Sequence, residues 1–438
     1  MDIFKAVGDF AEANHYVDVE DKIPVFLCSI GSHIFNGINK CSICPFIPTG
    51  EDDEFAIDEC ILRHDKMPIY TPMSHVADTR LHILMRGAKG SGKSVLLQLF
   101  LAPGTGLLYH PHAYDFGLGF RTDIGPNSIT EAGMFGSVNE DGEIMGRPLA
   151  REMCGGFLGF EEMSSLMDAG KKDHSLDMKN QLLTSTDNGR VKKAMKAGWV
   201  EYLTRYTIWG GTQPGRMDLE SGLDRRFFII DIEMSPGKEL AYKRAQTRQA
   251  SITSEHRLDM ADRIQAMQQW FVKRAAEAVM EPPTGIVFSE ELNEWLMQDE
   301  VRGHEADLFR RLCIGYAMMR PTWIGGTELI VDLDDTLRNL LNMCLKMRRN
   351  VMDSDIKLIK TAFWNSEMSR SALLKEIARM ITNGDYQAAK RWAEENLLNQ
   401  SWYSELKPTV KKRGPRGVTV YIGYRDIEVA ATQWGDEQ

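Results

Sequence analysis

The segment Gly87-Ala88-Lys89-Gly90-Ser91-Gly92-Lys93-Ser94 has the residue types and the spacing of a phosphate-binding loop, G-x-x-x-x-G-K-[ST]. Its glycines allow backbone N–H groups to face phosphate oxygens, which side chains would otherwise block. In such a loop Lys93 reaches the β- and γ-phosphates of a nucleotide, and Ser94 binds Mg²⁺. We therefore predict that ATP and Mg²⁺ bind at this loop. The predicted nucleotide-binding residues are Gly87, Gly90, Gly92, Lys93, Ser94 and Val95.

Two adjacent acids follow a short apolar run further along the chain. Phe157–Phe160 predicts a strand, and Glu161-Glu162 stands at its end. Nucleotide hydrolysis needs one acid that holds Mg²⁺ and a second that orients and deprotonates the attacking water. We assign Glu161 to the metal and Glu162 to the water. An acid pair after a strand is also a common start of a helix, but its position after a phosphate-binding loop favours the catalytic assignment.

Two later segments could complete a hydrolytic site. Tyr206–Trp209 predicts a strand, and the polar Gln213 beyond it could reach between the acids and the γ-phosphate. Arg225 and Arg226 directly precede the apolar run Phe227–Ile230. An arginine there could neutralise charge at the nucleotide of a neighbouring subunit. Alone, the two arginines would be interpreted as solvated residues at a loop end; the order of the motifs favours the catalytic role.

The elements that must position these residues alternate between strands and helices. Leu81–Met85 predicts a strand before the phosphate-binding loop, and Val95–Phe100 predicts a helix after it, whose N-terminus favours anions. This alternation over residues 71–236 is typical of an α/β sheet. Residues 237–350 predict mainly helices, at Glu239–Gln249, Met260–Val279 and Glu305–Met319.

The order of the motifs is that of AAA+ ATPases, and residues 86–233 resemble the minichromosome maintenance (MCM) replicative helicases. In that family the acid motif ends in Asp-Glu, where Glu161-Glu162 stands here. The sensor strand ends in Ala-Ala-Asn-Pro, where Gly210–Pro214 stands here, and the arginine finger lies in Ser-Arg-Phe, where Arg225-Arg226-Phe227 stands here. The resemblance spans roughly residues 80–320. It implies a hexameric ring in which Gln213 is the first sensor and Arg226 is the finger.

Two insertions of that family also have counterparts. Gly136–Arg147 resembles a hairpin inserted into the second helix, and Asp187–Trp199 resembles the hairpin before the first sensor. In the family both line the central channel, which implies that Lys192, Lys193 and Lys196 face DNA. Lysines at such a position contact phosphates without reading sequence, as suits a motor. The alternative is a basic surface hairpin that only aids solubility.

The chain departs from the family at several positions. Glu161 replaces an aspartate and Gln213 replaces an asparagine, and because Mg²⁺ demands tight octahedral geometry the hydrolysis rate is in question. The second-sensor arginine is expected near His304, and the choice stays open among the three nearby arginines, Arg302, Arg310 and Arg311. About 80 residues precede the loop, where the family has a large DNA-binding half. We expect a shortened, divergent relative of the kind that viruses or mobile elements carry.

The pattern from residue 351 is three helices followed by a β-hairpin, which predicts a winged-helix domain, also present at the C-terminus of the family. The hairpin surrounds a basic turn, Lys411–Gly417, in which Lys411-Lys412-Arg413 are the predicted DNA contacts. The predicted recognition helix is Gln387–Asn396, and Glu394-Glu395 places negative charge on it, so a protein-docking role stays open. The predicted domains are a small N-terminal domain (1–70), an AAA+ α/β core (71–236), a helical lid (237–350) and a winged helix (351–438).

Four N-terminal cysteines could form a zinc module. Their positions include one C-x-x-C: Cys28, Cys41, Cys44 and Cys60. Zinc prefers four thiolate or imidazole ligands in a tetrahedron, and His33 or His64 could substitute for a cysteine. Buried apolar cysteines are the alternative.

Composition limits the classes of function. A chain of 438 residues with a net charge of −10 does not coat nucleic acid, so DNA contacts must come from local basic patches. No signal peptide or membrane span is expected, and seven cysteines, an odd number, favour a reducing compartment. We expect a cytoplasmic, nucleoid-associated protein.

These observations predict an ATP-driven DNA translocase or helicase of the MCM type in DNA replication, with DNA and replication or origin proteins as partners. Two alternatives stay open. One is an AAA+ protein remodeller of the chelatase, MoxR or enhancer-binding type. The other is a nucleotide-gated origin-binding protein with little turnover, which Glu161 and Gln213 suggest. DNA-stimulated ATP hydrolysis would separate the helicase from both.

Overall fold

The computed structural model describes most of the chain, in two compact units. The described residues are 1–14, 16, 19, 21–35, 79–87, 90–110, 120–126, 129–141, 144–163, 173–196, 198–213, 225–232, 236–249, 253–363, 367–380, 382, 384–394, 409–414 and 417–423. The first unit comprises Met1–Thr212 and Arg225–Leu345, and the second comprises Gln213–Asp224 and Lys346–Gln438. No helix in these described ranges is long and apolar enough to span a membrane.

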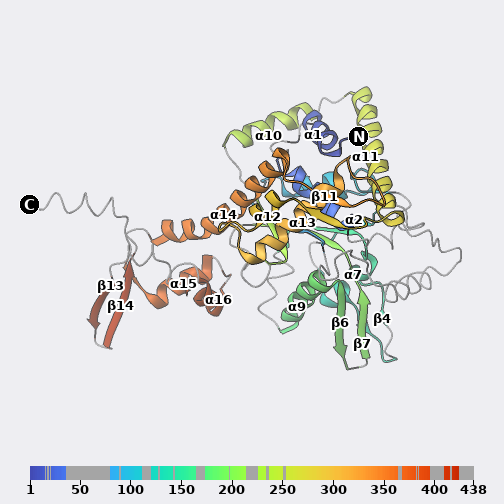
Figure 1. The fold of residues 1–438 in the computed structure, drawn as a ribbon. Coiled ribbons are helices and arrows are strands. Elements are labelled where there is room, and N and C mark those ends of the chain that lie inside the picture. The colour runs from blue at the N-terminus through green and yellow to red at the C-terminus, as the bar shows by residue number, and fades with distance from the viewer. Residues whose placement is uncertain are drawn as a thin grey trace, which may run out of the picture. The chain divides into compact units, whose positions relative to one another are not determined.

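A five-stranded parallel sheet forms the centre of the first unit (Figure 1). Its strand order is β2-β5-β8-β1-β9. The strands are β1 (His82–Arg86), β2 (Thr122–Ile124), β5 (Phe157–Phe160), β8 (Thr207–Thr212) and β9 (Phe227–Asp231). The three inner strands are buried along their whole length, as expected of a parallel sheet that is covered on both faces. The predicted α/β fold class is therefore confirmed at the level of a central parallel sheet with helices.

Three helices cover one face of this sheet: α2 (Ile23–Phe35), α5 (Lys93–Leu101) and α13 (Gly303–Met319). Phe26 of α2 and Phe100 of α5 both pack against Trp209 of β8, with ring centroids 4.9 and 5.6 Å from its ring. Helices α2 and α13 approach so closely that a Cβ on Gly315 would lie 1.7 Å from the backbone oxygen of Cys28. Glycine is therefore required at that crossing.

The first 35 residues group with the central sheet in the first unit. The sequence had instead predicted a separate N-terminal domain over 1–70. Helix α1 (Ile3–Ala13) precedes α2, and α2 is buried on almost every side between the sheet and α13. A helix that is apolar all round belongs in a core, which explains the difference. Residues 36–78 lie outside the described residues.

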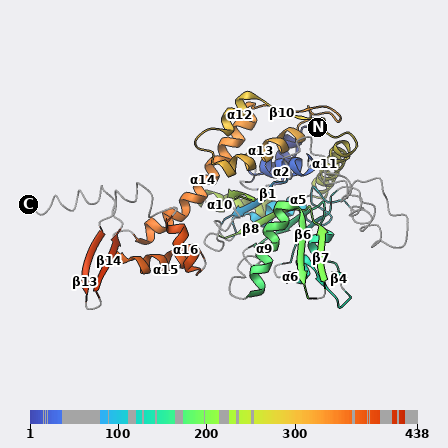
Figure 2. The same cartoon turned by 60° about the horizontal axis from the view of Figure 1, so that its bottom comes forward.

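Helix α9 (Asp173–Asn188) reaches the opposite face of the sheet and leads into a β-hairpin. The hairpin consists of β6 (Arg190–Met195) and β7 (Gly198–Leu203), in register from Arg190 opposite Leu203 to Met195 opposite Gly198. Figure 2 shows it beside α9. A shorter hairpin, β3 (Ser137–Val138) with β4 (Ile144–Met145), stands between α6 (Glu131–Phe135) and α7 (Leu149–Glu152). Both predicted insertions are therefore hairpins.

The region predicted as a helical lid contains α10 (Pro236–Gln249), α11 (Ser254–Met280), α12 (Glu290–Leu296) and the first part of α14 (Asp335–Phe363), besides α13. It also contains a parallel pair that the sequence did not predict, β10 (Ile286–Phe288) with β11 (Leu329–Val331). Strands of three residues are too short to show a period of two. Helix α11 ends at Met280, just before Pro282-Pro283, and proline cannot continue a helix.

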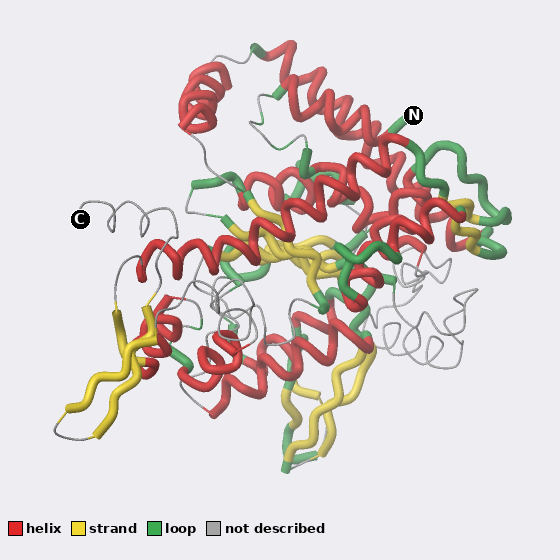
Figure 3. Tube along the Cα trace, turned by 60° about the vertical axis from the view of Figure 1, so that its left-hand side comes forward, coloured by secondary structure: helices red, strands yellow, loops and turns green. Residues whose placement is uncertain are grey.

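The second unit contains the end of α14, α15 (Arg370–Met380), α16 (Tyr386–Ala393) and a three-stranded antiparallel sheet of order β12-β14-β13. Its strands are β12 (Glu367–Ser369), β13 (Thr409–Gly414) and β14 (Gly417–Gly423), the last two drawn as a hairpin in Figure 3. The predicted basic turn is shorter than expected. Lys411-Lys412-Arg413 lies within β13, because pairing continues to Gly414 opposite Gly417.

Candidate active site

The phosphate-binding loop connects the end of β1 to the start of α5, as predicted. Gly90 and Gly92 adopt φ angles of 82° and 100°, a left-handed conformation that side chains other than glycine rarely tolerate. Gly92 is the N-cap of α5, and no side chain caps this helix. The first turn of α5, with Lys93, Ser94 and Val95, is therefore open to an anion. Ala88 and Lys89 lie outside the described residues.

Lys93 is buried, with 7% of its surface exposed, and lies folded into the loop. Its Nζ donates hydrogen bonds to the backbone oxygen of Gly87 at 2.6 Å and to Oγ of Ser91 at 3.5 Å. Burial lowers the pKa of Lys93, and the negative charge of Glu162 opposes that shift. The lysine of the loop and the second acid of the pair are thus within electrostatic reach of each other.

Strand β8 joins the acid pair to the loop, because it lies between β5 and β1 in the sheet. The Met163 N–H, just after the acids, donates to the Gly211 oxygen at 2.6 Å, and the Gly87 N–H donates to the Thr212 oxygen at 3.1 Å. A Cβ on Gly211 would lie 2.5 Å from the backbone oxygen of Glu161 and 3.5 Å from Cδ of Lys93. The end of β8 therefore fixes both the acids and the loop at the carboxyl edge of the sheet, where α/β proteins bind ligands.

These residues fit a nucleotide with Mg²⁺. The donors are the uncapped helix start and Lys93, and the carboxylates are Glu161 and Glu162. A side chain at Gly211 would collide with the backbone of Glu161 and touch Lys93. Ser94, Glu161 and Glu162 are half-buried, so hard oxygen ligands are accessible. Gln213 follows directly after β8 and is also half-buried.

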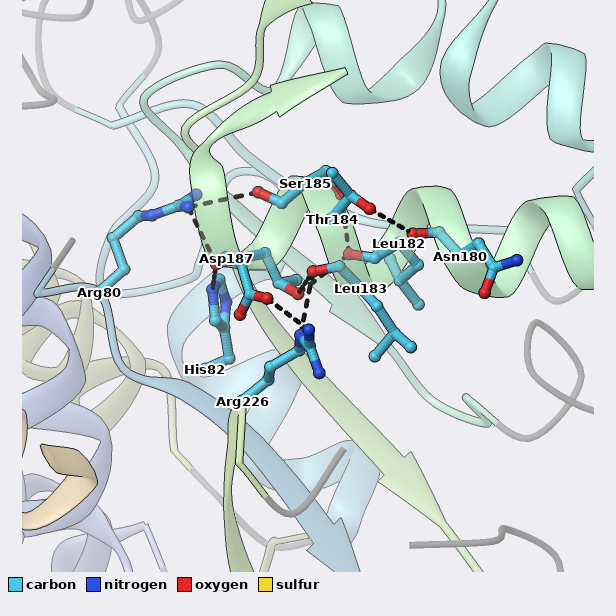
Figure 4. Close-up of polar contacts among 10 residues, drawn as sticks. Arg80, His82, Asn180, Leu182, Leu183, Thr184, Ser185, Asp187 and Arg226 are labelled. Atoms are coloured by element: carbon cyan, nitrogen blue, oxygen red, sulfur yellow. Dashed lines mark hydrogen bonds and ion pairs between the residues drawn. The ribbon is translucent and has the colours of Figure 1, made fainter. Parts of the chain in front are cut away.

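Arg226 lies at the opposite edge of the sheet, immediately before β9. Because β9 runs parallel to β1, this edge is separated from the loop by the length of a five-residue strand, roughly 16 Å at about 3.3 Å per residue. Arg226 Nε donates to the Leu183 oxygen at 3.1 Å, and its guanidinium forms an ion pair with Asp187 (Figure 4). Arg226 therefore does not reach the loop of its own chain.

The end of α9 is held by two further residues that sequence reasoning missed. The buried Arg80 donates to the Tyr206 oxygen at 2.5 Å and to the Ser185 and Thr186 oxygens at 3.3 and 3.2 Å. His82 accepts the Ile208 N–H at Nδ1, so its Nε2 carries the proton that is donated to the Thr186 oxygen. Helix C-termini favour such cationic and donor groups. Figure 4 shows Arg80, His82 and Arg226 converging on this helix end.

The three lysines of the β6–β7 hairpin do not share a face. Lys192 points outward, 3.5 Å from Glu201 and over the ring of Trp199 at 5.5 Å from its centroid. Lys193 points to the other face, as alternation along a strand requires, and forms a 2.8 Å ion pair with Glu131. Its side chain is 17% exposed. Lys196 is exposed at the turn.

The second-sensor candidates differ in their surroundings. Arg311 is bound to Asp307 at 2.7 Å and donates to the backbone oxygen of Arg80, at the edge of the sheet away from the loop. Arg310 is half-exposed with Asp307 3.8 Å away, and Arg302 precedes α13. The contacts of Arg311 are those of a residue that attaches α13 to the sheet, which leaves Arg302 and Arg310 as the open choices.

The described part of the zinc prediction consists of core residues. Cys28 is fully buried in α2, and burial raises the pKa of its thiol. His33 bonds Oγ1 of Thr207 at 2.7 Å and the Gly155 oxygen at 3.0 Å. Among the residues described, no group of three or more His, Cys, Asp or Glu side chains could hold a metal. The other predicted ligands, Cys41, Cys44, Cys60 and His64, lie outside the described residues.

Comparisons with known proteins add no family to this arrangement. No protein-family model matches the chain, and no curated protein sequence matches it significantly.

Proposed function

We propose that this chain is an ATP-driven DNA translocase of the MCM-like AAA+ type, working as a ring. The observation that carries the proposal is the meeting of Lys93 and Glu161-Glu162 at the end of β8. A phosphate-binding lysine beside two carboxylates is the minimum set for nucleotide hydrolysis. Arg226 at the far edge supports a shared site, because it could act only on a neighbouring subunit.

Each residue of the site has a distinct task under this proposal. The loop N–H groups and Lys93 would hold the phosphates, exchanging the present bonds of Lys93 to Gly87 and Ser91 for phosphate oxygens. Ser94 and Glu161 would hold Mg²⁺, which neutralises charge on the phosphates. Glu162 would orient the attacking water and take its proton.

The order of elements in the second unit supports the winged-helix part of the proposal. Helix α14 is followed by β12, α15, α16 and the β13–β14 hairpin, and β14 pairs with both other strands. The exposed surface of α16 carries Lys390 and Arg391, which adds positive charge to the predicted recognition helix. This charge favours DNA over the protein-docking alternative.

The test is the steady-state ATPase rate with and without single-stranded DNA. Lys93→Ala is expected to remove turnover, and Glu162→Gln is expected to lower it at least about 100-fold while nucleotide still binds. The double variant Lys192→Ala/Lys196→Ala should lose the increase caused by DNA. The matched control is Lys5→Ala/Lys273→Ala, which removes two exposed lysines from other surfaces and should keep that increase.

The outcomes separate the candidates. Turnover that DNA does not change would contradict the translocase and favour a protein remodeller. The ion pair of Lys193 with Glu131 agrees with the remodeller, because it removes one lysine from the exposed face of the hairpin. Nucleotide binding without turnover would favour a nucleotide-gated DNA-binding protein.

A further inference from the structure

The outward face of the β6–β7 hairpin carries an exposed tryptophan, Trp199. It is 61% exposed, whereas the other described tryptophans are buried or half-buried. An exposed tryptophan loses the free energy that burial of its large apolar surface would give. Its exposure is therefore a reason to look for a bound ligand that covers the ring. Its neighbours in sequence explain the exposure: Gly198 and Val200 belong to the face that packs inward, and Val200 is fully buried.

The surroundings of Trp199 are positively charged. Arg190 and Lys192 lie on the outward face, where Glu201 pairs with both, at 2.7 and 3.5 Å, and Lys196 is exposed at the adjoining turn. Three cations and one acid leave an excess of two positive charges in a chain whose net charge is −10. This local excess is what a protein of negative net charge needs in order to bind a polyanion at one place.

The register of the hairpin holds the Trp199 ring and the Lys192 side chain next to each other. Register places Trp199 opposite Ala194 and Glu201 opposite Lys192, so Lys192 extends across the strand over the ring. Ala194, directly opposite Trp199 on β6, is small and does not cover the ring. The opposite face of the hairpin is anchored by buried Val191 and Tyr202, with Tyr202 donating to the Phe135 oxygen at 3.0 Å.

We propose that this face, comprising Trp199, Lys192, Arg190 and Lys196, is a stacking platform for single-stranded DNA. A base would stack on the Trp199 ring while Lys192 and Arg190 exchange Glu201 for the flanking phosphates. The bases of a duplex are stacked on each other and present no free ring face, so the platform selects unpaired strands. The inference rests on the proposed function, since it names the form of DNA that the hairpin holds.

The experiment measures binding of the full chain to a fluorescein-labelled thymidine oligonucleotide of about 20 residues by fluorescence anisotropy, with no ATP present. Trp199→Ala is expected to weaken binding roughly 5- to 150-fold, and Trp199→Phe should retain most of the affinity. Leu258→Ala, which truncates an equally exposed apolar residue on α11, is the matched control and should change binding less than twofold. Affinity for a blunt duplex of equal length should be the same for wild type and Trp199→Ala.

Two further variants separate stacking from charge. Lys192→Ala should lower the slope of log affinity against log salt by about 0.7, whereas Trp199→Ala should leave the slope unchanged. Glu201→Gln, which frees both cations, should tighten binding. Bound oligonucleotide should also quench tryptophan fluorescence in wild type more than in Trp199→Phe.

Equal binding by Trp199→Ala and Leu258→Ala would overturn the platform, even if DNA still raises the ATPase rate of wild type. A wild-type chain whose ATPase rate does not respond to DNA, but whose binding depends on Trp199, would keep the platform and overturn the translocase.

Discussion

Gly211→Ala is the substitution that most directly tests how the acids are positioned. Gly211 lies in β8 between the acid pair and the loop, and an added Cβ would approach the Glu161 backbone oxygen to 2.5 Å. Real Cβ atoms keep at least 3.0 Å from such an atom, so one backbone must move by half an ångström or more. The contact with Cδ of Lys93 would be 3.5 Å, which is ordinary, so the strain falls on the acid side.

The structure sets the size of the two expected effects. Overpacking costs about 1–3 kcal/mol, and loss of the bond from the Met163 N–H to the Gly211 oxygen costs about 0.5–1.5 kcal/mol. The change from glycine returns about 0.5–1 kcal/mol through lower entropy of the unfolded chain. We therefore expect a net destabilisation of about 1–3 kcal/mol. Because a misplacement of about 1 Å can lower a rate 100-fold, a shift of half that size or more should lower kcat roughly 10- to 100-fold.

The assay compares kcat for ATP, binding of a fluorescent nucleotide and thermal unfolding. Gly303→Ala is the matched control, since a Cβ there meets nothing within 4 Å. Gly210→Ala is an intermediate case, because its Cβ would meet Sδ of Met163 at 2.4 Å, and a side chain can turn away. A folded Gly211→Ala protein that keeps kcat within twofold of wild type would refute the assignment of Glu161 and Glu162 to the site that β8 builds.

Three further predictions address other parts of the first unit. Arg226→Ala should lower turnover by about 10³-fold or more, and mixing it with Lys93→Ala chains, which keep the arginine, should restore activity if Arg226 acts on a neighbouring subunit. Arg80→Met should lower the free energy of unfolding in urea by about 3 kcal/mol, because buried carbonyls lose charge-assisted hydrogen bonds; Arg263→Met, at an exposed ion pair, should cost at most about 0.5 kcal/mol. Burial raises the pKa of Tyr206 from 10.0 to about 12, so the unfolded chain ionises first and stability present below pH 10 is lost between pH 10 and 12. Urea unfolding across that range should show a loss of at most roughly 3 kcal/mol from this group, absent in Tyr206→Phe.

The sequence predicted four of the five sheet strands, β1, β5, β8 and β9, because each contains a short apolar run. Strand β2 was not predicted, since its three residues, Thr122–Ile124, form no apolar run, and β8 extends to Thr212 and not only to Trp209. Phe157–Phe160 was placed without error, and β9 differs from its predicted range by one residue. The loop followed from glycine spacing, which is a local signal. The same reasoning failed for β10 and β11, whose three-residue runs have no period, and for α2, whose place in the core depends on a close crossing with Gly315.

Pairing of side chains could not be predicted, because the partners are distant in sequence. Lys193 looked like its neighbour Lys192, and only the hairpin register shows that Glu131 neutralises it on the inner face. Arg80 and His82 were missed for a different reason. Their partners are backbone carbonyls of α9, which carry no sequence signal at all.

The phosphate-binding loop, the acid pair, Arg226 and the β6–β7 hairpin lie far apart in sequence, yet all four are connected to one end or the other of β8. At its carboxyl end, β8 holds the loop and the acid pair through the Thr212 and Gly211 oxygens. At the other end, the Tyr206 oxygen accepts from Arg80, which also holds the last turn of α9. That turn binds Arg226 and leads through Gly189, with a φ of 60°, into the β6–β7 hairpin. Because close-packed interiors transmit strain, we expect a shift of the acids to act on Arg226 and the hairpin through these contacts. Under the proposed function, this shared attachment is the physical route by which hydrolysis in one subunit would move the strand of DNA held by Trp199.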